Sequence, residues 1–158
     1  MGHFPTKRNH NVPLRKGPHV VYCLHAHLVF VTRERRDALS EPAIADLSYI
    51  FARVCRNFEA ELMECNGGDD HVHLLIAYPP QLALSELVSR LKGVSSRLLL
   101  DWRPEVRGRY EDGSLWSPSY FVCACGGAPL PIITRYIRAQ RDPPSRRLPH
   151  NPERRGHP

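Results

Sequence analysis

The stretch AELMECNGGDDHVHLLIAY, residues 60–78, decides the fold because it holds two strand segments separated by a short turn. Residues 60–65 and 71–78 are the two segments, and Asn66-Gly67-Gly68 predicts the turn because glycine takes a positive φ without strain. Pro79-Pro80 ends the second segment. The stretch therefore predicts a hairpin in the middle of the chain.

A helix is predicted on each side of this hairpin. Ser40, followed by Glu41-Pro42, predicts the start of the first helix, and Ser85 predicts the N-cap of the second. Both helices carry one apolar face at helical spacing. The apolar residues are Ile44, Leu47, Phe51, Val54 and Phe58 in the first helix, and Leu87, Val88, Leu91, Val94, Leu98 and Leu99 in the second.

Two outer strands and a last helix complete the predicted fold. Residues 19–32 are rich in β-branched and aromatic side chains and predict a long first strand, whereas 115–126 predict a fourth strand after a loop at 103–114. A last helix begins near Pro129 to Pro131 and carries IITRYIRAQ, residues 132–140. The order β-α-β-β-α-β-α predicts an α+β, ferredoxin-like or RRM-like split βαβ fold, with both main helices on one face of an antiparallel sheet.

The positive charge of the chain lies in its two tails. Of the formal net charge of +6, residues 1–18 contribute +4 and residues 141–158 contribute +3, so the middle is close to neutral. We expect a basic flexible arm at 1–18, one folded domain at 19–141 and a disordered tail rich in proline and arginine at 142–158. Basic tails suit an anionic partner such as nucleic acid, but solvated basic tails are also common.

Hydropathy and cysteine usage predict a cytoplasmic protein. The sequence shows neither an apolar run long enough for a membrane span nor a secretory signal, so we expect no membrane partner. Its five cysteines form an odd set without a CxxC pair, which favours free thiols in a reducing compartment over a disulfide framework or a zinc site.

Two His-x-His pairs are candidates for a metal site. His25 and His27 lie in the first predicted strand, and His71 and His73 lie in the third. Alternation places the members of each pair on one face of their strand, but not on a known face of the sheet. The second pair follows two aspartates that could orient an imidazole. In an isolated sequence, two polar residues on an exposed sheet face are the more common explanation of such a pair.

The last predicted helix offers further groups. Tyr136 and Gln140 are four residues apart and therefore share a helix face. A tyrosine hydroxyl can act as a nucleophile and an amide oxygen can ligate a hard cation. Spacing alone favours packing of Tyr136 with Ile133 and Ile137 over a catalytic role. Tyr120 on the fourth strand competes as a nucleophile, although an aromatic residue on a strand is more often core or a stacking platform.

Several blocks together resemble the single-tyrosine transposases of HUH type, small insertion-sequence enzymes that move single-stranded DNA. The resemblance covers roughly residues 19–141. The blocks are HAHLVFVTRERR, DDHVHLL, RLKGVSSRLL, LWSPSYFV, CGGAPL and RYIRAQ, in the order and spacing of that family.

This resemblance implies a site and a chemistry. It makes His71 and His73 the metal-binding pair, Gln140 an additional ligand for Mg²⁺ or Mn²⁺, and Tyr136 the nucleophile that forms a 5′-phosphotyrosine. It implies no role for His25 and His27, which we expect to be structural. The catalytic block departs from the family at Arg138 and Ala139, where an acid and a polar residue would be more typical.

The resemblance also implies the partners. These are single-stranded DNA hairpins at element ends and a second copy of the chain, with Gly126-Gly127 as a possible hinge that lets the tyrosine serve the other subunit. We expect action on DNA in the nucleoid. Basic side chains are candidate phosphate contacts or, alternatively, a solvated surface; they are Arg90, Lys92, Arg97, Arg15 and Lys16.

Two other functions remain open. A domesticated relative that cleaves hairpin DNA would need the same site. A catalytically silent module for single-stranded nucleic acid would instead need exposed aromatic side chains on the sheet.

Overall fold

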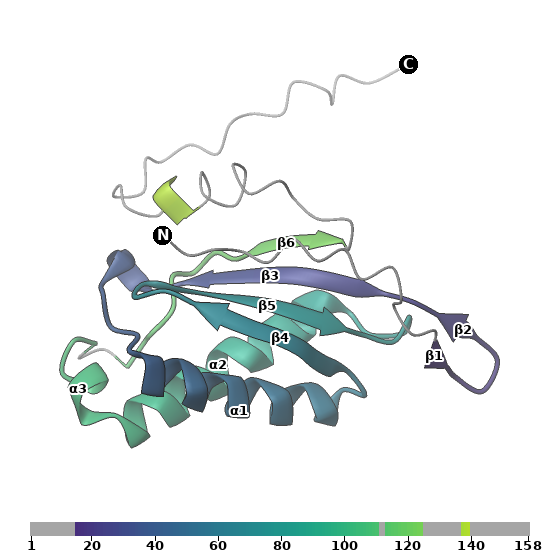
Figure 1. Cartoon of the computed structure of the whole chain (residues 1–158), viewed down its shortest axis with the longest axis horizontal. Coiled ribbons are helices and arrows are strands. Elements are labelled where there is room, and N and C mark those ends of the chain that lie inside the picture. Colours follow the sequence, from purple (N-terminus) through teal and green to yellow (C-terminus); the bar gives the residue numbers. More distant parts are fainter. Residues whose placement is uncertain (1–14, 111–112, 125–136, 140–158) are drawn as a thin grey trace, which may run out of the picture.

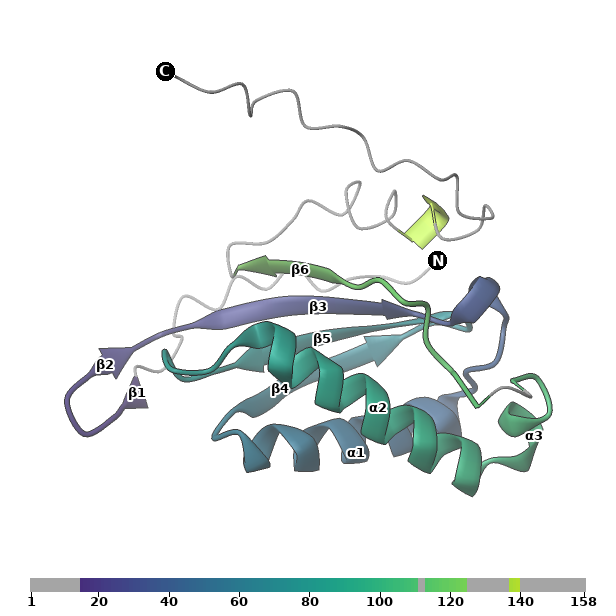
Figure 2. The ribbon, with the colours of Figure 1, turned by 180° about the vertical axis from the view of Figure 1, so that it is seen from behind.

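A four-stranded antiparallel sheet with two long helices on one face forms the body of the protein (Figures 1 and 2). The computed structural model describes residues 15–110, 113–124 and 137–139. The sheet order is β4-β5-β3-β6. The strands are β3 (His25–Val31), β4 (Glu61–Gly67), β5 (His71–Ala77) and β6 (Phe121–Ala124), and the helices are α1 (Glu41–Asn57) and α2 (Leu84–Trp102).

This order confirms the predicted split βαβ fold. The hairpin strands β4 and β5 pair directly, yet the partner of β5 on its other side is β3, from the start of the domain. Each helix therefore crosses over one strand before the chain re-enters the sheet, and both crossovers lie on the same face (Figure 2). The opposite face is left for other contacts.

The core lies between the sheet and the two helices. Val72, Leu74 and Ile76 of β5 are fully buried within it, next to Leu28 and Phe30 of β3. The helices contribute the apolar faces that their spacing predicted, with buried side chains at Leu47, Phe51, Leu87, Leu91 and Leu99. Ile50, which was not among the predicted residues, is also buried. Because side chains alternate along β5, His71 and His73 point away from this core, toward the open face.

One of the two predicted helix starts is correct. Ser40 is the N-cap of α1, and its Oγ accepts a hydrogen bond from the backbone N–H of Ala43 at 3.3 Å. The prediction for α2 was wrong. Ala83 is its N-cap and makes no side-chain cap bond, so Ser85 already lies inside the first turn.

The outer strands are shorter than predicted. The region 19–32 is broken into β2 (Val21–Tyr22) and β3, and β2 pairs with β1 (Arg15–Lys16) as a small separate ribbon. Residues 15–16 of the expected flexible arm are thus strand. Among the described residues of the predicted fourth strand, 121–124 form β6, and Trp116 makes an isolated bridge with Thr32. The predicted loop at 103–114 contains a short helix, α3 (Pro104–Arg107).

Several predicted features lie outside the described residues. These are Tyr136, Gln140, the Gly126-Gly127 hinge, and nearly all of both tails. Residues 137–139 are helical and lie on the open side of the sheet, opposite α1 and α2 (Figures 1 and 2).

Candidate functional site

Asp69 and Asp70 form the turn of the β4–β5 hairpin. The turn was predicted earlier in the chain, at Asn66-Gly67-Gly68. The backbone N–H of Gly68 donates to the carbonyl of His71 at 3.0 Å, which closes the turn around the two aspartates. Neither Gly67 nor Gly68 has a positive φ, so the predicted reason for these glycines was wrong.

The glycines are needed for close approach instead. A Cβ on Gly67 would lie 2.6 Å from the carbonyl oxygen of His71, and one on Gly68 would lie 2.8 Å from Cε1 of the His71 ring. Any side chain at residue 68 would therefore displace the imidazole. The absence of a side chain leaves room for His71 beside the turn.

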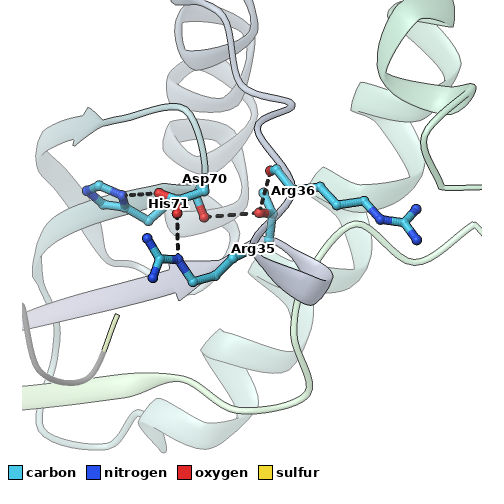
Figure 3. A network of polar contacts seen from close by, with 5 residues as sticks. Arg35, Arg36, Asp70 and His71 are labelled. Carbon is cyan, nitrogen blue, oxygen red and sulfur yellow. Dashed lines mark hydrogen bonds and ion pairs between the residues drawn. The ribbon is translucent and has the colours of Figure 1, made fainter. Parts of the chain in front are cut away.

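Asp70 holds the ring of His71 in one orientation (Figure 3). Nδ1 of His71 donates to Oδ1 of Asp70 at 2.8 Å, and Nε of Arg35 donates to Oδ2 of the same carboxylate at 2.7 Å. Burial alone would raise the pKa of Asp70, but the bonds from His71 and Arg35 hold it below its usual value. Because Nδ1 donates to Asp70, Nε2 is the nitrogen through which the His71 ring can bind a ligand.

His73 has a partner that the sequence did not reveal. Nδ1 of His27 lies 3.0 Å from Nε2 of His73, and the two rings stack with their planes 11° apart. Val29 is the direct neighbour of His73 across β3 and β5, so His27 is its diagonal neighbour. The matching alternation of the two His-x-His pairs was a signal for this contact, but only the strand register could place the rings together.

The paired imidazoles are held in the neutral form. Burial lowers the pKa of His73, and the neighbouring imidazoles of His27 and His71 lower it further. Burial also lowers the pKa of His27, against the opposing effect of Glu64. Neutral imidazoles are the form that binds metal. Among the residues that the structure describes, no three His, Cys, Asp or Glu side chains converge as a metal site.

The predicted phosphate contacts of α2 are not brought to the histidines, because α2 covers the opposite face of the sheet. Arg90 and Arg97 are exposed on this helix. Lys92 instead donates from Nζ to the carbonyls of Ser117 at 2.6 Å and Ser119 at 3.2 Å, where it supports the segment that leads into β6. Burial lowers the pKa of Lys92.

The two basic residues of β1 have different surroundings. Arg15 forms an ion pair with Glu61 at the start of β4, which ties the small ribbon to the edge of the main sheet. Lys16 is exposed. Neither contacts the histidine pair in the described structure.

The sequence of the chain is similar to those of known transposases. A family model described as "Transposase IS200 like" matches residues 20–140. The chain belongs to the IS200-like transposase family. The matched range includes His71, His73, Tyr136 and Gln140.

Individual relatives agree with this membership. The ISDra2 transposase TnpA of Deinococcus radiodurans is 30% identical over 129 residues, covering 82% of this chain and 92% of that protein. The transposase for insertion sequence element IS200 of Salmonella typhimurium is 27% identical over 100 residues, covering 63% of this chain and 66% of that protein.

The fold also matches an experimental structure. A crystal structure of a Deinococcus radiodurans R1 protein assigned as a transposase superposes with a TM-score of 0.71 at 30% identity. The match covers 80% of this chain and 97% of that one. The IS200-like chain therefore has the fold of that transposase structure. None of the described helices is long and apolar enough to cross a membrane.

Proposed function

We propose that this IS200-like transposase cleaves and rejoins single-stranded DNA at hairpin-bearing element ends, with Tyr136 as nucleophile and a divalent metal on His71, His73 and Gln140. The orientation of the His71 ring is the observation that carries the proposal. The ring lies on the open face of the sheet and its Nδ1 is engaged by Asp70, which leaves Nε2 as the ligand atom that the ring can offer.

The donor set fits a metal, with one condition. His71 and His73 lie two residues apart on the same face of β5 and can be ligands of one ion. Nε2 of His73 lies against Nδ1 of His27, so a metal at that nitrogen has to replace this contact. Two imidazoles with one amide oxygen suit Mn²⁺ at least as well as Mg²⁺, which prefers oxygen ligands. The ion would polarise the scissile phosphate and neutralise its developing charge.

Tyr136 would carry the covalent step. Its phenolate oxygen attacks phosphorus, the bond from phosphorus to the 3′ oxygen breaks, and the products are a 5′-phosphotyrosine and a free 3′-OH. A 3′-OH from another DNA end then attacks the same phosphorus and releases the tyrosine, so no ATP is needed. An ordinary tyrosine has a pKa of about 10 and is protonated at neutral pH, so the site has to favour its ionisation.

The proposed partners follow from family membership and from the sequence resemblance. The substrate is a DNA hairpin in single-stranded form, within the nucleoid of the cytoplasm. The active unit is a homodimer in which Gly126-Gly127 lets the tyrosine helix of one subunit serve the other. Charge supports a DNA partner, because both tails of the chain are basic.

A silent nucleic-acid-binding module is the second candidate. Register places Phe121 of β6 beside Val29 on the open face, and Phe121 is the aromatic residue that the described strands present there. The same face carries His27, His71 and His73. Imidazoles held neutral favour the metal-dependent enzyme, including a domesticated nuclease with the same site.

One assay separates these functions. The full chain is incubated with Mn²⁺ or Mg²⁺ and a set of labelled single-stranded hairpins, and a covalent adduct is sought on a denaturing gel. We expect an adduct with wild type and none with Tyr136→Phe or His71→Ala/His73→Ala, while Tyr120→Phe serves as the matched tyrosine control. Binding without an adduct for wild type would support the silent module. Cleavage without strand joining would support the nuclease.

A further inference from the structure

The loop that follows β3 is held in a strained conformation. Glu34 and Arg35 both have left-handed backbone angles, with φ values of 57° and 50°. Two such residues in succession are unfavourable for side chains other than glycine. Thr32 holds the loop closed, because its carbonyl accepts from the N–H of Arg35 at 2.9 Å and its Oγ1 donates to the carbonyl of Arg36 at 2.8 Å.

The strained loop sends neighbouring arginines in opposite directions (Figure 3). Arg36 points away from the histidine site, toward Glu34 and the backbone of Arg109. Arg35 turns back beneath His71 and bonds Asp70, with only 14% of its side chain exposed. The left-handed backbone thus serves to place one guanidinium beside the His71 ring.

That guanidinium retains an unused donor. Nη1 of Arg35 is enclosed and has no hydrogen-bond partner in the described part of the chain. A buried charged donor without an acceptor is unfavourable, and native structures leave few of them. The carboxylate beside it is already shared, with Oδ1 on His71 and Oδ2 on Arg35.

We propose that Arg35 binds a phosphate of the DNA strand next to the histidine pair. This inference rests on the proposed function. His71 and Arg35 share the Asp70 carboxylate, so a phosphodiester bound at the histidines lies within reach of the guanidinium. A phosphate oxygen is the acceptor that Nη1 lacks, and it reaches this atom once the side chains that enclose it move aside. The planar fork of arginine suits phosphate geometry. Arg35 is therefore a substrate-binding residue that Asp70 orients, rather than only a support for Asp70.

The test is the salt dependence of binding without metal. Affinity for a labelled single-stranded hairpin oligonucleotide is measured by fluorescence anisotropy in EDTA, between about 50 and 200 mM salt. The double variant Arg35→Gln/Asp70→Asn removes the ion pair without changing the net charge, and it is compared with Asp70→Asn alone. We expect the double variant to bind about tenfold more weakly at low salt and to lose about 0.7 from the slope of log K against log salt.

The helix layer offers a matched control. Nε of Arg103 donates to Oδ2 of Asp46 at 2.6 Å, an ion pair of the same geometry that lies away from the histidines. Arg103→Gln/Asp46→Asn should keep the wild-type slope. If the double variant at Arg35 keeps the slope and affinity of Asp70→Asn, the proposal is overturned and Arg35 is purely structural.

The variant Arg35→Lys and the covalent adduct on Tyr136 give two further measurements. Should the double variant fail to fold by circular dichroism, Arg35→Lys retains the charge and should keep the slope but bind severalfold more weakly. Unchanged affinity in that variant would contradict a guanidinium contact. A wild-type adduct on Tyr136 combined with unchanged binding in the Arg35 variants would reject this inference alone, whereas absence of wild-type binding and adduct would reject the proposed function.

Discussion

Asp70 connects two structural units of the site through a single carboxylate. One oxygen fixes the ring of His71, and the other receives Arg35 from the strained loop. Its backbone carbonyl also accepts from the N–H of Thr32 at 2.8 Å, which locks the hairpin tip to the end of β3. Asp70 is therefore more than a turn residue, because its carboxylate sets the orientation of the His71 ring.

Replacing Asp70 by asparagine should weaken metal binding. An amide cannot hold the Nδ1–H of His71 as a carboxylate does, so the ring is less well oriented and its Nε2 less basic. Loss of such a supporting carboxylate typically lowers metal affinity by about 10- to 100-fold. Isothermal titration with Mn²⁺ measures the change. Asp69→Asn removes the same charge one residue earlier and should bind as wild type, and equal affinities for both variants would exclude this role of Asp70.

The neutral histidines predict a pH dependence of stability for the metal-free protein. The pKa values of His27 and His73 are lowered in the folded state, so the unfolded chain binds more protons just below the ordinary histidine pKa of about 6.5. Their stabilisation is complete above that value and is lost as pH falls toward the folded pKa values. Asp70, whose pKa is lowered, loses its contribution only in more acidic solution.

Urea unfolding between pH 5 and pH 7.5, a window of about two to three units around the histidine pKa, measures this effect. The free energy of unfolding should rise with pH, and His27→Gln should flatten the rise. His19→Gln, on the exposed connection between β1 and β2, serves as the control. An unchanged pH slope in His27→Gln would show that burial of this imidazole does not control stability.

At the scale of elements, the two helix starts differ although both sequences offer a serine. Ser40 caps α1, whereas α2 begins at Leu84, one residue before Ser85. Ser40→Ala should lower the free energy of unfolding by about 1 kcal/mol, because the N–H of Ala43 loses its acceptor. Ser85→Ala should change it by less than about 0.5 kcal/mol. Chemical denaturation of both variants measures the contrast, and equal losses would place a functional cap at Ser85 as well.

Gly93 lies within α2 with open space around its Cα. A Cβ there meets no heavy atom within 4 Å, so Gly93→Ala adds helix propensity without a clash. It should stabilise the protein by about 0.5–1 kcal/mol. Gly113 also has open space, but its φ of +75° strains an alanine, so Gly113→Ala should destabilise. Thermal unfolding of the two variants should shift in opposite directions, and a loss of stability in Gly93→Ala would contradict the open surroundings.

At the scale of the whole molecule, one aromatic cluster connects the sheet, the helices and the segment before β6. The rings of Phe30 and Phe51 pack against Trp116, whose Nε1–H donates to Oγ of the fully buried Ser95 on α2 at 2.9 Å. This cluster places β6 beside β3 and thereby completes the open face.

Ser95→Ala should destabilise the whole domain. The substitution leaves the buried N–H of Trp116 without an acceptor, which costs about 1–3 kcal/mol. Urea unfolding followed by circular dichroism measures the loss. Ser89→Ala, on the exposed side of the same helix, is the matched control and should be neutral. A loss in Ser95→Ala no larger than in the control would mean that the Trp116 bond adds nothing to stability.

The prediction of the fold from sequence succeeded where a local pattern dictates a local structure. The apolar faces of α1 and α2, the cap at Ser40 and the central hairpin depend on residues close together in the chain. The error at the Gly67-Gly68 turn occurred where a tertiary contact overrode such a pattern. The hairpin turns at the aspartates, whose carbonyls accept backbone N–H groups from residues 32–39.

The sequence by itself determined the βαββαβ order, the chemical groups available for the site and, through its resemblance, the transposase family. Tertiary structure decided which face of the sheet His71 and His73 occupy and brought His27 and Arg35 to them. The physical reason is that alternation along a strand is local, whereas neighbours across a sheet depend on strand register between segments about forty residues apart. No periodicity within one segment specifies that register.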